Sequence, residues 1–321
     1  MAFRVADAME LSKKIKTSLG ETRILILGAQ ILIGFQFRGV FQDGFERLPA
    51  HARYLDGVAL VFMLAAAALL IAPALCHRII AGGEDSGDIH QLISRMAAAA
   101  LLPFAVSLGM SLFIGIERVA GLGAGVAAGV GFGGLALFAW YGWEFIRTES
   151  VGRKEREMTA MQRNEREKTP LHNKIEQMLT EARVILPGAQ ALLGFQLAII
   201  LTQSFEKLPP LSQAIHALSL GCVALTVILL MAPAAYHRIV YAGEDTAEFH
   251  RTGSILVTAA TVPLALGMST DLFVVMAKIA GTEAGGVIAA LALVGFIALW
   301  HVYPAVRRGL VGSTTSRSPA E

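Results

Sequence analysis

The sequence has few charged residues and few cysteines, and each shortage removes a class of protein. Charged residues make up 16% of the chain, whereas a soluble domain has about 25%, so a water-soluble protein is not expected. Its two cysteines, Cys76 and Cys222, imply no disulfide framework. A net charge of +2 gives no basis for binding nucleic acid. No recognised catalytic motif occurs, so the sequence does not favour an enzyme, and no cofactor is expected.

Long apolar runs dominate the chain instead. Hydrophobic residues make up 55% of it, and an apolar run of about 20 residues is long enough to cross a bilayer. These runs predict eight membrane-spanning helices, with the lipid bilayer as the first partner of the protein. The predicted spans are residues 24–41, 58–75, 96–116, 123–145, 184–201, 215–235, 254–276 and 285–303.

The chain repeats itself after 160 residues. The segment Ala72–Arg78 ends one apolar run, and its counterpart Ala232–Arg238 ends another run 160 residues later. Each copy has four predicted spans, and an even number places both copies in the same orientation in the membrane. We therefore expect an all-α integral membrane protein of two parallel four-helix repeats with pseudo-twofold symmetry.

The distribution of charge predicts the domain plan and the topology. Lysine and arginine gather in the N-terminal segment, in the two His-Arg turns and in the linker between the repeats. Positively charged loops stay in the cytoplasm, so we expect both termini there. The plan comprises a cytoplasmic amphipathic segment (1–23), repeat 1 (24–147), a charged linker (148–182), repeat 2 (183–307) and a disordered tail (308–321).

Several polar side chains fall within the predicted spans or at their ends. A polar group in a membrane requires a partner, and an intramembrane acid is a functional candidate. One hypothesis is that these residues line a pathway at the interface between the repeats. The other is that they hold neighbouring helices together by hydrogen bonds. The candidates are Arg23, Gln30 and Gln36 in the first copy, and Arg183, Gln190, Gln196 and Asp271 in the second.

A cluster of histidine, arginine and acidic residues ends the second span of each copy. Histidine beside carboxylates suits a divalent metal site or a pH sensor. The third hypothesis is a structural salt-bridge network, with Arg78 paired to Glu84 or Asp85. The cluster comprises His77, Arg78, Glu84, Asp85 and His90 in the first copy, and His237, Arg238, Glu244, Asp245 and His250 in the second.

A further signature runs through the first two spans of each copy. In the second copy it consists of Arg183, Gly188, Gln190, Leu192, Gly194, Phe195, Phe205, Ala232, Pro233, His237 and Arg238. On these residues each half resembles a family of uncharacterised bacterial four-span membrane proteins, over residues 10–147 and 170–307. The resemblance implies a tandem fused duplication in the bacterial inner membrane, and it implies no activity.

Two functions are favoured by the sequence, and a third, a membrane enzyme, would need ionisable groups that converge in a cleft and has no recognised catalytic pattern. The first is a channel or a transporter of an ion or small solute, with its path at the interface between the repeats. The second is a non-transporting membrane scaffold or sensor that uses the cytoplasmic His/acid turns. The two fused copies also suggest that single-copy relatives work as dimers, and a homo-oligomer of this chain is a further candidate assembly.

Overall fold

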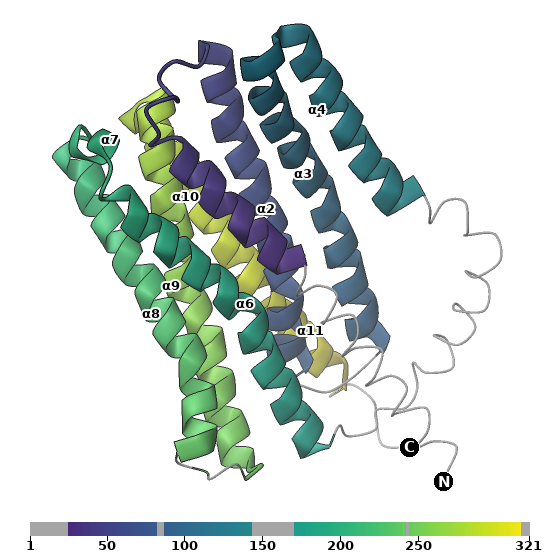
Figure 1. The fold of residues 1–321 in the computed structure, drawn as a ribbon. Helices are drawn as coiled ribbons and strands as arrows, with labels where there is room; N and C mark the ends of the chain where they lie inside the picture. The colour runs from purple at the N-terminus through teal and green to yellow at the C-terminus, as the bar shows by residue number, and fades with distance from the viewer. Residues whose placement is uncertain (1–24, 82–86, 143–169, 240, 242–243, 316–321) are drawn as a thin grey trace.

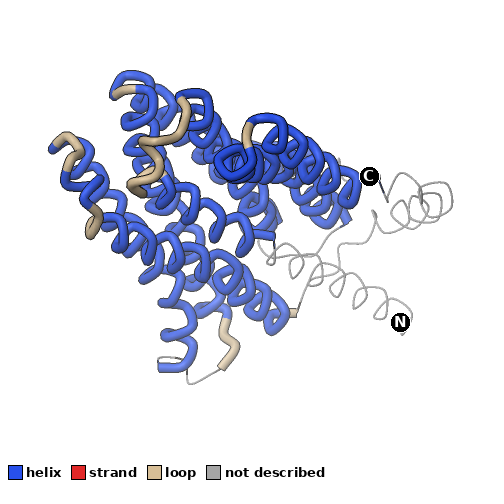
Figure 2. The backbone as a smooth tube through the Cα atoms, turned by 45° about the horizontal axis from the view of Figure 1, so that its top comes forward, coloured by secondary structure: helices blue, strands red, loops and turns tan. Residues whose placement is uncertain are grey.

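The computed structural model describes residues 25–81, 87–142, 170–239, 241 and 244–315, and these residues form helices joined by short turns, with no strand among them (Figures 1 and 2). The helices of the first repeat are Leu25–Gly39, α2 (Ala50–Ala81), α3 (Gly87–Ala120), α4 (Leu122–Leu137) and η1 (Phe138–Gly142). Those of the second repeat are α6 (Leu171–Ile199), α7 (Gln203–Glu206), α8 (Pro210–Ile239), α9 (Ala247–Ala280), α10 (Thr282–Ile297), η2 (Ala298–Val302) and α11 (Tyr303–Thr315).

Six described stretches of helix are long and apolar enough to cross a membrane. They are Ala50–Ile80, Gln91–Ala120, Leu171–Ile199, Pro210–His237, Ala247–Ala280 and Thr282–Leu310. Two shorter apolar helices, Leu25–Gly39 and Leu122–Leu137, occupy the places of the first and fourth predicted spans. The expectation of an all-helical chain with helices suited to a bilayer is therefore confirmed.

The same backbone turn joins the third and fourth helices of each repeat. Gly121 lies between α3 and α4 with φ of 85°, and Gly281 lies between α9 and α10 with φ of 91°. This left-handed region is open to glycine at little steric cost. One glycine therefore reverses the chain between two long helices at matching places in the two copies.

The first helices of the two repeats cross in close contact. The rings of Phe35 and Phe195, which are equivalent residues, lie 5.0 Å apart between centroids. Near this crossing Gly188 faces Gln30, and a Cβ atom at Gly188 would lie 1.4 Å from the amide oxygen of Gln30. The glycine therefore leaves the space that the buried amide of Gln30 fills.

A second set of contacts ties the end of the chain to its beginning. The indole of Trp300 in η2 donates a hydrogen bond of 2.9 Å to the carbonyl oxygen of Ala68 in α2. At the far end of α9, Lys278 Nζ donates to the carbonyl oxygen of Val40 at 3.0 Å. Helix α2 thus packs against α3 of its own repeat and against α9, η2 and α11 of the other (Figure 1).

Candidate functional site

The end of α2 presents a histidine and an arginine to a carboxylate of the other repeat. His77 Nδ1 lies 3.1 Å from Glu181 Oε1. Arg78 Nε donates to Glu181 Oε2 at 2.9 Å, and Arg78 Nη2 donates to the same oxygen. The third guanidinium nitrogen of Arg78, Nη1, donates to the carbonyl oxygen of Ser254 at 3.3 Å. The side chains of Arg78 and Glu181 are only 8% and 3% exposed, so this ion pair joins the repeats away from water.

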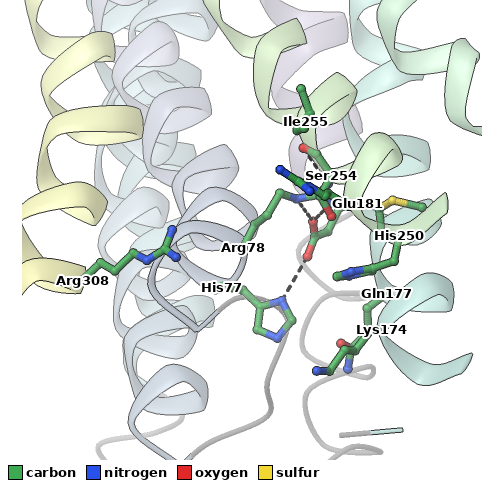
Figure 3. A pocket seen from close by; sticks show the side chains of 11 residues that line it. His77, Arg78, Lys174, Gln177, Glu181, His250, Ser254, Ile255 and Arg308 are labelled. Carbon is green, nitrogen blue, oxygen red and sulfur yellow. Dashed lines mark hydrogen bonds and ion pairs between the residues drawn. The ribbon is translucent and has the colours of Figure 1, made fainter. Parts of the chain in front are cut away.

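A cavity of about 490 Å³ lies beside this ion pair (Figure 3). Figure 3 shows the Glu181 carboxylate between Arg78 and His77, with Arg308 extending toward it from α11. Both repeats supply the walls, so the cavity exists only when they are packed together. The lining residues are His77 and Arg78 from α2, Lys174, Gln177, Met178 and Glu181 from α6, His250, Arg251, Ser254 and Ile255 from α9, and Arg308 from α11.

The lining of this cavity, called the basic pocket below, is strongly cationic. The described residues that line it include four Lys or Arg side chains, two His side chains and one carboxylate, that of Glu181. Glu181 forms an ion pair with Arg78, and Arg251 and Arg308 add further positive charge to the lining. A concave surface lined by one sign of charge attracts ligands of the opposite sign, so the pocket is suited to an anion.

The matching cluster of the second copy makes a smaller network. His172 Nδ1 lies 2.5 Å from Asp245 Oδ2, and His237 Nε2 lies 3.4 Å from Asp245 Oδ1. The hydrogen bond from His172 holds the pKa of the Asp245 carboxyl below its ordinary value. The neighbouring Glu244 is exposed. These contacts fasten the start of α6 to the link between α8 and α9.

The described residues offer no set of ligands for the metal ion that one hypothesis assigns to the His/acid clusters. The described residues contain no group of three or more His, Cys, Asp or Glu side chains placed to hold a metal ion. Glu84 and Asp85 lie outside the described residues, and the side chains of His90 and Arg238 are outside the description as well.

The glutamines in the second half of each first helix lie in two separate clusters. Gln36 Nε2 donates to Ser107 Oγ and Ser111 Oγ at 2.9 Å each. In the second repeat, Gln196 Nε2 donates to Asp271 Oδ2 at 2.7 Å and to the hydroxyl of a serine on α8 at 2.8 Å. Each cluster therefore forms within its own repeat.

The earlier glutamines, Gln30 and Gln190, have different environments although they are equivalent in sequence. Gln30 is 4% exposed and packs against the other repeat, whereas Gln190 is exposed. The cavity beside Gln30 has a volume of about 10 Å³, which is about one water-sized probe. Arg183 is exposed, and Arg23 lies outside the described residues.

Two buried ionisable residues, Glu181 and His216, are not among the candidates that the sequence predicts. Glu181 is identical to Glu21 at the 160-residue shift, which was a signal of its importance. His216 occupies the position of Asp56 in the first copy, so both copies carry an ionisable residue there. Nothing in the sequence links Glu181 to His77, because only the packing of the two repeats brings them together.

Comparison with known proteins gives one result. The model of one protein family matches the chain twice, over residues 7–144 and over residues 164–304, and its description is "Family of unknown function (DUF6328)". The double match agrees with a tandem duplication. No curated protein and no solved structure matches the chain.

Proposed function

The chain belongs to this family of unknown function, DUF6328, and since membership assigns no activity, we propose from its own residues that it is a membrane protein whose basic pocket binds an anionic ligand. Four Lys or Arg side chains in a cavity of about 490 Å³, against one carboxylate, are the observation that carries this proposal. On this proposal the protein is a membrane sensor or scaffold.

The membrane arrangement that goes with this proposal has eight spans in two parallel repeats, with both termini and the basic pocket on the cytoplasmic side of the inner membrane. Its support is that the end of α2, the start of α9 and α11 meet at the pocket. At the opposite end of α9, Lys278 contacts Val40, just after the first helix. Inverted repeats would separate these groups. The Phe35–Phe195 contact, which joins equivalent residues of the two first helices, is further support for this arrangement.

A phosphate-bearing group is the anion that fits this pocket best. Guanidinium groups such as those of Arg251 and Arg308 bind phosphate oxygens through paired hydrogen bonds. At a membrane boundary the phosphate belongs either to the headgroup of an anionic lipid or to a free molecule in the cytoplasm. Both sources would present the same phosphate oxygens to the pocket, and an experiment separates them.

The test uses purified full-length protein in nanodiscs of neutral lipid. The melting temperature, Tm, is measured while inorganic phosphate is added, and again after part of the lipid is replaced by an anionic phospholipid. We expect either inorganic phosphate or the anionic phospholipid to raise Tm, and the one that does so identifies the source of the phosphate. The double variant Arg251→Gln/Arg308→Gln should lose most of that rise. The matched control, Arg38→Gln/Arg47→Gln, changes two exposed arginines at the other end of the protein and should respond as wild type. A pocket variant that responds as wild type would refute the proposal.

A channel or transporter of an ion or small solute is the second candidate. The observation that favours it is the small cavity beside the buried Gln30, which lies between helices of the two repeats. Flux of K⁺, Na⁺, H⁺ and Cl⁻ is measured in liposomes for Gln30→Leu and for the matched variant Gln190→Leu, whose wild-type side chain is exposed. Loss of flux in the first variant alone would support this path, and unchanged flux in both would remove it.

A further inference from the structure

Two ionisable side chains of the second repeat face each other in its interior. His216 on α8 is 0% exposed and Asp271 on α9 is 4% exposed. His216 Nδ1 and Asp271 Oδ1 lie 3.8 Å apart. Neither atom has a hydrogen-bond partner among the described residues. A distance of 3.8 Å is roughly 1 Å longer than an ordinary N–H···O hydrogen bond, so the two atoms are neighbours without a bond between them.

The other polar atoms of this pair are already engaged, and they fix its protonation. His216 Nε2 lies 3.2 Å from the backbone carbonyl oxygen of Gln196. A carbonyl only accepts, so Nε2 is the nitrogen that carries hydrogen in the neutral ring. Asp271 Oδ2 accepts from Gln196 Nε2 at 2.7 Å. The two atoms left over are Nδ1 and Oδ1, which are the two that face each other.

Without an added proton, the facing atoms are both acceptors. A neutral His216 would point the lone pair of Nδ1 at an ionised Asp271, in a place from which water is excluded. A buried polar group without a partner is costly, and a buried charge without one is more costly still. One proton removes both problems, either on Nδ1 as an imidazolium beside a carboxylate or on Oδ1 as an acid that donates to the ring. We propose that His216 and Asp271 form a buried site that binds one proton between Nδ1 and Oδ1.

The surroundings of the pair close it off and connect it to the other repeat. The His216 ring lies between Phe205 of α7, at 5.2 Å between centroids, and Phe37 of the first repeat, at 6.0 Å in a stacked arrangement. Loss of the proton therefore acts on a ring that supports the contact between the repeats.

Other groups near the pair account for the remaining polar contacts and charges. From α6 the amide of Gln196 faces Asp271. On α8 the Cys222 thiol lies within electrostatic range of Asp271, and the Ser219 hydroxyl donates to the carbonyl oxygen of Gly267 at 2.8 Å. On α9 itself, the Lys278 ammonium two turns onward is directed to Val40 and toward Glu46. None of these groups bridges His216 Nδ1 and Asp271 Oδ1, so in our proposal a bound proton makes that link.

The first repeat does not reproduce this pair. Asp56 stands at the position of His216, and Ser111 stands at the position of Asp271. Ser111 accepts from Gln36, so this position holds a neutral hydroxyl in the first copy. The His216–Asp271 pair therefore belongs to the second copy alone, whereas the first copy has one carboxyl, Asp56, whose Oδ2 lacks a hydrogen-bond partner among the described residues.

The variant Asp271→Asn is the key reagent, because it imitates the protonated state. Its amide nitrogen donates to His216 Nδ1, while its amide oxygen accepts from Gln196. We expect Tm of the wild type in nanodiscs to fall by several degrees as the pH rises and the proton leaves. The Asn variant should keep the higher Tm and lack this step. The control His51→Gln changes an exposed histidine of the first repeat and should retain the step.

Histidine nitrogen signals give a second measurement that does not depend on stability. In protein labelled with ¹⁵N-histidine, the His216 signal is identified by its loss in His216→Gln. We expect hydrogen on Nε2 at every pH tested, and a change at Nδ1 on raising the pH that is absent in Asp271→Asn. A wild type and an Asn variant with the same pH profile would overturn the proposal. So would a transition that follows the Na⁺ concentration at fixed pH, because a metal ion would then occupy the site.

Discussion

At the scale of the residue, the buried carboxylate of Glu181 finds its partners on another helix. Glu181 of α6 accepts from Arg78 of α2, and its other oxygen lies beside His77. Coulomb attraction in this water-poor place offsets the cost of removing the charges from water only while both members are present. The pair therefore makes the packing of the two repeats sensitive to a single side chain.

Replacing Glu181 by Ala should destabilise the protein strongly. It leaves the guanidinium of Arg78 buried without its carboxylate, and breaking a buried pair from one side costs about 3–5 kcal/mol. Unfolding in a mild detergent, followed by tryptophan fluorescence, measures the loss. The exposed Glu244→Ala serves as the control and should be close to neutral. A double variant Arg78→Met/Glu181→Met should recover most of the loss, and failure to recover would show that the charge itself is not the cause.

Asp245 gives a prediction on pH. Its pKa is lowered first of all by the hydrogen bond from His172, so the contact contributes stability above the ordinary aspartate pKa of about 3.9. That contribution is lost as the pH falls through the lowered value in the folded protein. A carboxyl titration followed by ¹³C NMR should show the pKa of Asp245 rising toward its ordinary value in His172→Gln. The distant variant His51→Gln should leave it unchanged, and an unchanged pKa in His172→Gln would contradict the assignment.

At the scale of the element, glycines decide how closely the first helices of the repeats approach. A Cβ atom at Gly34 would lie 2.0 Å from the Phe195 ring, and one at Gly188 would meet Gln30. The equivalent glycines, Gly194 and Gly28, have no such neighbour within 4 Å. The repeats are therefore alike in sequence at these positions and different in what the positions contact.

These four glycines form a matched set for substitution by alanine. Gly34→Ala and Gly188→Ala should each destabilise the protein by about 1–3 kcal/mol, because they overpack the contact between the helices. Gly28→Ala and Gly194→Ala should be neutral or should stabilise by up to about 1 kcal/mol, because alanine favours a helix. Thermal unfolding of the four variants in one lipid environment measures the difference. Equal effects in all four would contradict the crossing of these helices.

At the scale of the whole molecule, periodicity and repetition predicted the helices, whereas the pairings came only from the packing. Apolar runs are local, so the sequence located membrane-suited helices such as α2 and α9. Gln30 and Gln190 look equivalent in sequence, yet one is buried and the other exposed, because the neighbours of a residue are set by distant parts of the chain. The same limit hid the pairing of His216 with Asp271.

Trp300 offers a test of how the repeats are joined. Trp300→Phe removes the indole donor to Ala68, and the loss of such a hydrogen bond costs about 0.5–1.5 kcal/mol. The equivalent Trp140 packs against Phe104 of its own repeat, so Trp140→Phe should have a smaller effect on the contact between repeats. Protease resistance of the folded protein, measured beside Tm, reports that contact. A larger effect at Trp140 would contradict the asymmetry.

The bond from Trp300 to Ala68 also bears on the order in which the protein is made. The two residues are 232 positions apart, and at a synthesis rate of about 5–20 residues per second the ribosome needs roughly 10–50 s to travel between them. During that interval α2 is already synthesised, and the side of it that Trp300 will cover is still open. The segment that carries Trp300 thus completes the cover of α2, so a chain that stops before it would leave α2, a helix made much earlier, open on that side.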